Sequence, residues 1–569
     1  AGTQSDTVDG DCTVDGELPP AWGKGGGEGV IHVWAGGQGT CGGTNWLDAV
    51  RDYASAVKLV DANHRTIWIA GTVPCTVKDT TSAFPLVVLG GFTGLECAAD
   101  ERQPGAKSVI DGQTLGAGVM IAQSASYPYD ASTISDIVFT NMYVSAASLS
   151  SRGMLNLVNC TITRCGWDDS DGARGCGLYV DASSTDTRVL VSNCVFDATY
   201  KGIAGGSDGY QFSHQVVYLK TAKEATIADT VFTGCGVARV SEWNSTRGRE
   251  KTEGDVLESA VPVTVERCSF RGNVFTAHNA GHGLIRLTSG SAGTAFRNCE
   301  FTGNVGQAYS NGGTCSADGK AGTYADALIV VEGGAAADAY SFDSCTFAYN
   351  TTEGGRAPVF SVFKGAVSVN NSIVWANYGL TNTAQTSAYA WKLVQGASAA
   401  FLKSADASIA FDYCLVGGPY DLPVTCFEDG VDPSLATATH LLTADPLLVT
   451  STADALSRLR FFFRYGGSSD SFQARYHFAN GDAGLAAAGE FAKSFVSHLR
   501  GRSGYTDETT GELVTFRRQE SPAIDAGDPA ADFSREPVQR DGRLNLGCWG
   551  NTPWATRRFD APGALLFIR

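Results

Sequence analysis

One short pattern recurs nine times along the chain: a mostly polar residue, a small residue that we call the slot, any residue, then an apolar residue. Asn193-Cys194-Val195-Phe196 is one example. Because side chains alternate along a strand, the slot residue and the apolar residue two positions later share one face. The recurrence of this face predicts strands that stack on one another. Six slots hold cysteine: Cys160, Cys194, Cys268, Cys299, Cys345 and Cys414.

The spacing between slots is irregular and ranges from 23 to 46 residues. One turn of a parallel β-helix needs roughly 20 residues, and the excess forms loops on the outside. A propeller does not tolerate so variable a period, and the repeat lacks the 3.6-residue periodicity of a helical solenoid. We therefore predict an all-β fold, a right-handed single-stranded parallel β-helix with an N-terminal helical cap and a C-terminal capping region containing one inserted helix.

A second position recurs three residues after the apolar residue of the strand. An inward asparagine at such a turn can bond the backbone of the next rung, and it tolerates left-handed geometry. We interpret this position as a structural ladder and not as catalytic. Cys165 and Cys235 occupy it in earlier rungs. Asparagine occupies it later, at Asn273, Asn304, Asn350 and Asn377.

The pattern divides the chain into an N-terminal segment and helical cap over 1–64, the β-helix over 65–430, and a C-terminal capping region over 431–569. A helix is predicted from Asn45 to Asp61, with Asn45 as its N-cap and an apolar face. A second helix is predicted from Asp482 to Arg500, with Gly501 after its end.

Composition restricts the function classes. The net charge of −17 disfavours nucleic acid and anionic lipid as partners. No apolar run approaches the ~18 residues of a transmembrane segment. The 16 cysteines include no CxxC pair, and the chain begins at Ala1 with a polar stretch. These features favour a secreted protein with some disulfides in caps and loops, while the slot cysteines serve mainly as packing groups.

Three segments carry a resemblance to known proteins. Residues 89–96 and 108–112 look like the N-terminal rungs of secreted bacterial β-helix proteins, and the Cys-x-Phe-x-x-Asn strands are similar to repeats of chlamydial polymorphic outer-membrane proteins. Residues 521–528 and 541–551 resemble the C-terminal module of the "choice-of-anchor" β-helix proteins of planctomycetes and verrucomicrobia. The resemblance covers most of residues 30–555. It implies a secreted, surface-associated protein and supplies no catalytic set.

Candidate chemistry is sparse. Asp169 and Asp171, followed by Gly172, offer oxygen ligands that suit Ca²⁺, but the distal glutamate of a full calcium loop is missing, so we interpret them first as a solvated acidic turn. If a lyase is present, Ca²⁺ on this loop with Arg174 as the base is the arrangement to test. Gly281-His282-Gly283 imitates a polygalacturonase motif, but no acidic partner motif precedes it, so we interpret it as the start of an ordinary strand.

We therefore expect first a non-enzymatic extracellular protein, structural or adhesive, acting as a subunit of a surface layer, fibre or other self-assembly. The apolar residues 564–568 suggest strand addition to a neighbouring subunit. The alternative is a polysaccharide lyase or glycoside hydrolase acting along the coil. Carbohydrate binding without turnover, through Trp167, Tyr210 and Trp243, is a third possibility.

Overall fold

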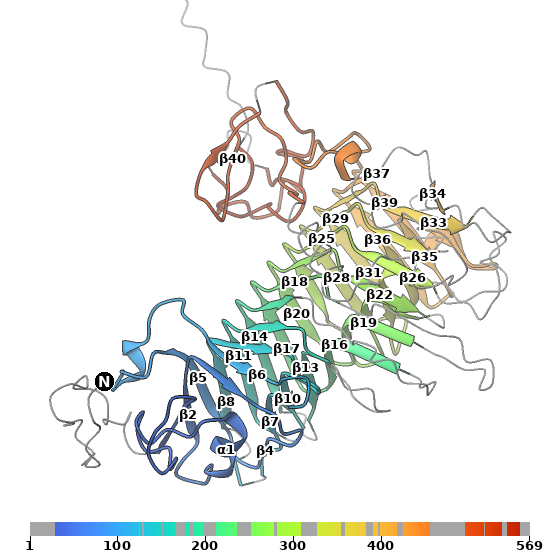
Figure 1. Ribbon diagram of the computed structural model, residues 1–569. Helices are drawn as coiled ribbons and strands as arrows, with labels where there is room; N and C mark the ends of the chain where they lie inside the picture. Colours follow the sequence, from blue (N-terminus) through green and yellow to red (C-terminus); the bar gives the residue numbers. More distant parts are fainter. Residues whose placement is uncertain are drawn as a thin grey trace, which may run out of the picture.

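The computed structural model describes residues 29–124, 126–127, 130–150, 152–166, 177–182, 186–197, 212–235, 252–277, 281–308, 327–353, 359–382, 391–395, 399–417, 425–455, 495–516, 518–537 and 543–557. Over these ranges the chain winds into a long coil of stacked strands (Figure 1). The described residues from 495 to 557, which we call the C-terminal segment, lie beside its far end. Nearly all strand pairs are parallel and join successive turns. The predicted right-handed parallel β-helix is therefore confirmed.

The coil has three faces, which we call A, B and C in the order in which the chain visits them in each rung. Face B is an eleven-stranded parallel sheet, and nine of its strands, from β9 onward, are those of the recurring pattern. Its strands are β3 (Thr72–Pro74), β6 (Ser108–Asp111), β9 (Ile137–Thr140), β12 (Thr161–Thr163), β15 (Val195–Asp197), β18 (Val231–Thr233), β21 (Ser269–Arg271), β25 (Glu300–Thr302), β29 (Thr346–Ala348), β32 (Ile373–Trp375) and β37 (Leu415–Gly417).

Face A precedes face B in each rung and is joined to it by a tight corner. Its strands are β1 (Val30–Trp34), β2 (Thr66–Ala70), β5 (Val87–Phe92), β8 (Ala131–Ser135), β11 (Met154–Val158), β14 (Arg188–Ser192), β17 (Glu224–Ala228), β20 (Val263–Glu266), β24 (Ala295–Arg297), β28 (Ala339–Asp343), the second half of β31 (Phe360–Asn370), β36 (Ala407–Asp412) and β39 (Ala436–Thr439). The strands of the coil thus begin before residue 65 and continue beyond residue 430.

Face C follows face B. Its strands are β4 (Thr81–Ser82), β7 (Val119–Ile121), β10 (Ala147–Leu149), β13 (Leu178–Asp181), β16 (Phe212–Thr221), β19 (Thr252–Ser259), β23 (Gly283–Leu287), β27 (Ala327–Glu332), the first half of β31, β35 (Ala400–Leu402) and β38 (Thr425–Phe427). Later rungs add a strand between faces B and C: β22 (Val274–Ala277), β26 (Val305–Ala308), β30 (Thr351–Glu353) and β33 (Tyr378–Asn382), the last paired antiparallel with β34 (Trp391–Gln395).

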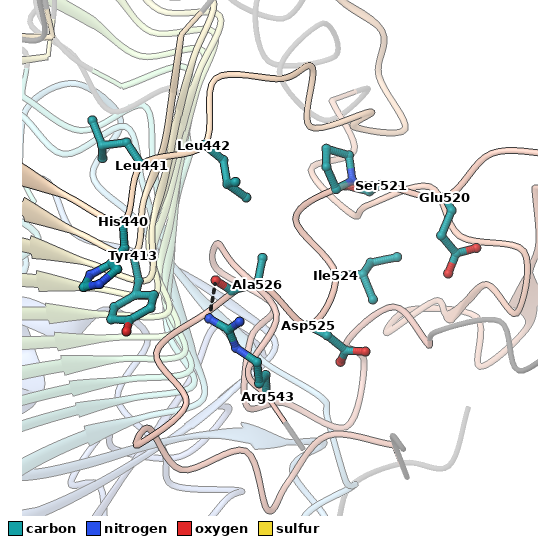
Figure 2. Close-up of a pocket in the computed structure, with 11 residues that line it drawn as sticks. Tyr413, His440, Leu441, Leu442, Glu520, Ser521, Ile524, Asp525, Ala526 and Arg543 are labelled. Atoms are coloured by element: carbon teal, nitrogen blue, oxygen red, sulfur yellow. Dashed lines mark hydrogen bonds between the residues drawn. The ribbon is translucent and has the colours of Figure 1, made fainter. Parts of the chain in front are cut away.

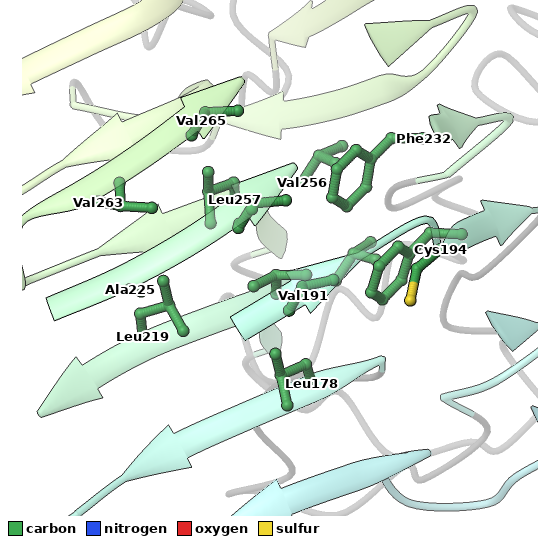
Figure 3. Close-up of a cluster of buried hydrophobic side chains, with 14 of the residues drawn as sticks. Leu178, Val191, Cys194, Leu219, Ala225, Phe232, Val256, Leu257, Val263 and Val265 are labelled. Atoms are coloured by element: carbon green, nitrogen blue, oxygen red, sulfur yellow. The ribbon is translucent and has the colours of Figure 1, made fainter. Parts of the chain in front are cut away.

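The recurring pattern owes its shape to the corner between faces A and B. At all nine repeats the residue before the slot has a positive φ between 47° and 61°, and this left-handed residue turns the chain. The slot side chain then points into the core. The apolar residues two positions later stack rung upon rung, and ring centroids from Phe196 to Phe347 lie 4.6–4.9 Å apart. Figure 3 shows part of this core, including Cys194 and Phe232.

The asparagines after face B form a continuous hydrogen-bonded chain through the core. The side-chain amide of Asn273 donates to Asn304 Oδ1 at 2.9 Å, Asn304 donates to Asn350 at 2.8 Å, and Asn350 donates to Asn377 at 2.7 Å. Each side-chain amide also donates to the backbone carbonyl of a phenylalanine in the preceding rung. The left-handed conformation expected at these asparagines belongs instead to the residue before each of them, such as Gly272.

The slot cysteines are buried free thiols. Their Sγ atoms lie near backbone carbonyls of the same and the preceding rung, as for Cys194 with Ser192 and Leu157. Burial raises the pKa of Cys414 to about 12, so this thiol is protonated at neutral pH. Cys41, Cys75 and Cys548, in the terminal regions, are free thiols as well, and no disulfide joins cysteines within the described ranges.

The N-terminal cap contains less helix than predicted. The helix α1 spans only Tyr53–Lys58, with Asp52 as its N-cap. The predicted helix start at Asn45 is wrong because the backbone of Val50 exchanges hydrogen bonds with β1, at His32 O and Trp34 N, and cannot be helical. Trp46 is fully buried and contacts Trp68 and Phe92 over the end of the coil. The other helical residues within the described ranges are two 3₁₀ turns, η1 (Ala99–Glu101) and η2 (Pro433–Leu435), and one helical turn at 452–455.

The C-terminal segment lies against the outer side of face B. Asn298 Nδ2 donates to the carbonyl of Cys548 at 3.1 Å, the amide of Cys548 donates to Thr346 Oγ1 at 3.0 Å, and the amide of Gly547 donates to the carbonyl of Asn371 at 2.8 Å. The segment contains the short hairpin β40 (Tyr505–Thr506) and β41 (Leu513–Val514). It therefore contacts several rungs along one face of the coil.

The helix predicted over 482–500 is wrong in its described part. Residues 495–500 are extended, and Leu499 forms an antiparallel bridge with Leu448. Phe495 and Leu499 of this stretch are buried because the stretch packs against the last rungs of the coil, where Phe495 contacts Tyr349. The rest of the predicted helix lies outside the described residues. Among the helices that are described, none has the length and hydropathy to span a membrane.

Candidate functional site

A bend within face C gathers polar side chains on the outside of the coil. In five successive rungs two consecutive residues both point into the core, which is possible in a strand only where the chain turns. The turn divides face C into two surfaces that meet at an angle, which we call the two walls of the corner. Outward side chains before the turn lie on one wall, and those after it lie on the other. The inward pairs are Val216 and Val217, Val256 and Leu257, Leu284 and Ile285, Leu328 and Ile329, and Val359 and Phe360.

One row of outward residues runs along this corner, one residue per rung. Tyr179 on β13 pairs in register with Tyr218 on β16, Tyr218 with Glu258 on β19, and Glu258 with Arg286 on β23. The two tyrosine rings are partly exposed, and their centroids lie 5.8 Å apart. We call Tyr179, Tyr218, Glu258 and Arg286 the face-C row. Its first half is aromatic and its second half is charged.

The aromatic half is flanked by an ion pair. Asp181 accepts a hydrogen bond from the hydroxyl of Tyr179 at 2.9 Å and pairs with Lys220 Nζ at 2.7 Å. The ammonium group of Lys220 is the main partner that offsets the burial of Asp181 and lowers its pKa. The ring of Tyr179 therefore lies beside a fixed ion pair, and the ring of Tyr218 packs against it from the next rung.

The charged half centres on Arg286, which lies between two carboxyl groups from neighbouring rungs. Its Nη1 lies 3.6 Å from Glu258 Oε1, and its Nη2 lies 2.9 Å from Glu332 Oε2. Burial, and then the negative charge of Asp255, raise the pKa of Glu258 to about 7. A carboxyl group with such a pKa can donate or accept a proton at neutral pH.

The other wall of the corner carries a buried acid–histidine pair. Asp255 accepts a hydrogen bond from the amide of Gly283 at 2.9 Å, and its second oxygen lies 3.1 Å from His282 Nδ1. Both side chains are buried. Gln215 pairs in register with Asp255, and its amide donates to Glu258. Its own carbonyl oxygen, Oε1, is buried and has no hydrogen-bond partner within the described part of the chain.

The glycines around His282 make this arrangement possible. Gly281 has a φ of +101°, and a Cβ there would lie 2.2 Å from Glu332 Oε1. A Cβ on Gly283 would lie 2.6 Å from the carbonyl of Ala327 in the next rung. Both positions therefore admit only glycine. The expected strand after this motif is present as β23, but the interpretation of His282 as an ordinary strand residue misses its contact with Asp255.

The residues that sequence reasoning selected for function are not part of this surface as described. Asp169, Asp171 and Arg174, and the aromatic residues Trp167, Tyr210 and Trp243, all lie outside the described residues. The Ca²⁺ and lyase hypotheses therefore stay predictions. One usable signal was overlooked: Gly254-Asp255 precedes the Gly281-His282-Gly283 motif by one rung.

A cavity of about 550 Å³ lies between the last rung and the C-terminal segment (Figure 2). The rings of Tyr413 and His440 stack in parallel with centroids 4.2 Å apart, and the guanidinium of Arg543 lies 5.7 Å from the Tyr413 ring centroid. Arg543 Nε donates to the carbonyl of Gly527 at 2.9 Å, and His440 contacts Asp412 at 2.7 Å. Most of the rings and charged groups that line this cavity thus contact other groups of the protein. We therefore interpret the cavity as part of the packing between the coil and the C-terminal segment, and not as a binding site.

The stacked faces and the ladders of inward side chains define the class of this protein as a right-handed parallel β-helix with a mixed aromatic and charged row on face C. Two solved structures are similar to it in fold alone. The A-module of the mannuronan C-5 epimerase AlgE4 from Azotobacter vinelandii is 12% identical, with a TM-score of 0.22 over 66% of this chain and 86% of that chain. Tailspike protein 3 of bacteriophage CBA120 is 10% identical, with a TM-score of 0.19 over 69% of this chain and 59% of that chain. No protein-family model and no curated protein sequence matches the chain.

Proposed function

We propose that this protein is an extracellular β-helix that binds a glycan chain lengthwise along face C. The observation that carries the proposal is the face-C row, in which Tyr179 and Tyr218 lie on successive rungs. Strands in a sheet repeat every 4.8 Å or so, a distance comparable to the length of one sugar in an extended polysaccharide. Successive sugars can therefore meet successive side chains.

The chemistry of the row suits a sugar surface. A tyrosine offers an apolar ring face together with a polar hydroxyl, which matches the apolar and polar sides of a pyranose. Asp181, Lys220, Glu258 and Arg286 supply fixed donors and acceptors alongside. Because these charges are paired within the protein and the whole chain carries −17, a neutral glycan fits better than a polyanion.

The extracellular location rests on the sequence resemblance to secreted surface proteins and stays part of the proposal. Binding a glycan outside the cell is what an adhesive protein does, so the expected adhesive role is included here. Self-assembly is a separate prediction, because residues 564–568, on which it depends, lie outside the described residues. Size-exclusion chromatography at high protein concentration tests it, and a monomer there contradicts it.

The test of the proposed function is binding to a glycan array followed by titration calorimetry with the best neutral oligosaccharide. We expect wild-type binding, and we expect Tyr218→Ala to weaken it about tenfold, which corresponds to about 1.4 kcal/mol. Tyr127→Ala is the matched control, since Tyr127 is a half-buried tyrosine outside the face-C row. Failure of the wild-type protein to bind any glycan, or equal effects of the two substitutions, contradicts the proposal.

A further inference from the structure

Two carboxyl groups on face C share one arginine across three successive rungs. We propose, building on the proposed glycan binding, that this protein is a glycoside hydrolase in which Glu258 protonates the leaving glycosidic oxygen and Glu332 accepts a proton from the attacking water. The two residues lie on β19 and β27, and Arg286 lies on β23 between them. A pair of carboxyl groups in two different environments is what hydrolysis of a glycosidic bond requires.

Glu258 has the environment of a proton donor. Its side chain is buried, and this burial opposes ionisation more strongly than the hydrogen bond from Gln215 and the ion pair with Arg286 Nη1 at 3.6 Å favour it. Asp255, on the same strand, adds a negative charge that opposes ionisation of Glu258. This carboxyl group therefore holds its proton near neutral pH, which a general acid must do before it can transfer that proton.

Glu332 has the environment of a proton acceptor. Arg286 donates two hydrogen bonds to the same Glu332 oxygen, from Nε at 3.1 Å and from Nη2 at 2.9 Å. Such charge-assisted bonds stabilise the ionised carboxylate. The Glu332 side chain is about a quarter exposed (27%) whereas that of Glu258 is 9% exposed, so water reaches Glu332 more readily. The close approach of Glu332 to the backbone depends on the glycine at position 281.

Gln215 supplies an independent sign of a ligand. Its side chain is 96% buried, yet its Oε1 has no hydrogen-bond partner within the described residues. A buried acceptor without a donor is uncommon in folded proteins. Because the amide of the same side chain donates to Glu258, the open acceptor lies beside the proposed acid. A hydroxyl of a bound sugar is the donor that this position can take.

The reaction balances with water as the only co-reactant. The bond between the anomeric carbon and the glycosidic oxygen breaks, and that oxygen takes the proton of Glu258. The water oxygen bonds to the anomeric carbon, and the proton that it loses passes to Glu332. Exchange with solvent then returns a proton to Glu258 and removes one from Glu332. Each cleavage consumes one water molecule and creates one new reducing end.

The experiment incubates the full chain with hexasaccharides of cellulose, xylan, mannan, chitin and β-galactan and measures new reducing ends. We expect turnover of at least one of them, and a fall in kcat of at least a hundredfold in both Glu258→Gln and Glu332→Gln. Both variants are expected to bind the same oligosaccharide within about threefold of wild type. Glu266→Gln is the control, since Glu266 lies in an exposed ion pair with Arg297 on face A.

The outcomes separate the two proposals. If the wild-type protein binds a glycan but releases no reducing ends, or if Glu258→Gln and Glu332→Gln cleave like wild type, the hydrolase inference is wrong and glycan binding stands. If the wild-type protein binds no glycan, the proposed function fails, and the inference fails with it. Far-UV circular dichroism and Tm of each variant identify a folding defect, and Gln215→Leu then provides a second variant, expected to lower kcat without unfolding the coil.

Discussion

The residue before each slot turns the chain with a left-handed backbone, although none of the nine is glycine. A left-handed conformation costs an ordinary residue about 1–2 kcal/mol, and asparagine and aspartate less than most. Six of the nine are one of these two, as at Asn159 and Asp229, which is why the first position of the pattern is mostly polar. The cost is offset by the inward side chains that follow, chiefly the slot residue and the ladder asparagine.

Removing one member of the asparagine ladder is expected to lower the stability of the folded protein strongly. Asn304 accepts hydrogen bonds from both the backbone and the side chain of Asn273, and it donates to Asn350 and to the carbonyl of Phe270. Asn304→Ala leaves several of these buried groups unsatisfied, so we expect the free energy of unfolding to fall by about 3 kcal/mol. Urea denaturation measures the change. Asn156→Ala, at a half-buried outward position, is the control and is expected to change stability by less than about 0.5 kcal/mol.

The proton on Glu258 links stability to pH. Its pKa is about 7 in the folded protein, against about 4.3 in an unfolded chain. Because the folded value is raised, its contribution is fully present below the unfolded pKa and is lost as the pH rises through the folded pKa. Burial is the main cause of the raised pKa and the charge of Asp255 adds to it, whereas Arg286, His282 and Gln215 lower the pKa and partly offset both.

We therefore expect the difference in unfolding free energy between wild type and Glu258→Gln to change between pH 4.5 and pH 8. Glutamine cannot ionise, so the unfolding free energy of the variant, relative to that of wild type, should increase by up to roughly 3 kcal/mol as the pH rises. Urea denaturation of both proteins at pH 4.5, 6 and 8 measures this difference, from which other titrating groups cancel. A constant difference across the three pH values contradicts a protonated Glu258.

At the scale of the strand, the sequence was informative wherever one rung repeats another. The slot pattern located the face-B strands because their inward residues have the same chemistry in every turn. The predicted helix from Asn45 failed because Val50 pairs with β1, and no local signal reveals that pairing. The face-C row was missed for a related reason. Tyr218, Glu258 and Arg286 align only once the register is known, and loops of different length hide that register in the sequence.

The contact between the C-terminal segment and face B can be tested by changing one corner residue of the coil. Asn298 has a φ of 52° and bonds the carbonyls of Cys548 and Gly550, so Asn298→Gly keeps the corner while removing both bonds. We expect faster amide hydrogen exchange over 543–557 in this variant, measured by mass spectrometry. Asn193→Gly changes an equivalent corner residue whose side chain bonds only Asn159 among its described contacts, and there exchange over 543–557 should stay at the wild-type rate.

For the whole molecule, stability comes from stacked side chains and not from cross-links in the described ranges. The slot thiols are buried and free, and the phenylalanine stack beside them continues over five rungs. We expect a strong reductant to shift Tm by less than about 2 °C, measured by differential scanning calorimetry, because no described structure depends on a disulfide. A large fall in Tm on reduction would show that cysteines outside the described ranges form important bridges.

The C-terminal segment has a consequence for how the coil comes apart. In a solenoid each rung touches only its neighbours, so rungs can in principle open one at a time from an exposed end. Here one segment bonds β24–β25 at Asn298, β29 at Thr346 and the following corner at Asn371. Opening any of these rungs disturbs a surface shared by all of them. The last third of the coil should therefore behave as a single cooperative unit, while fraying stays confined to rungs that the segment does not reach.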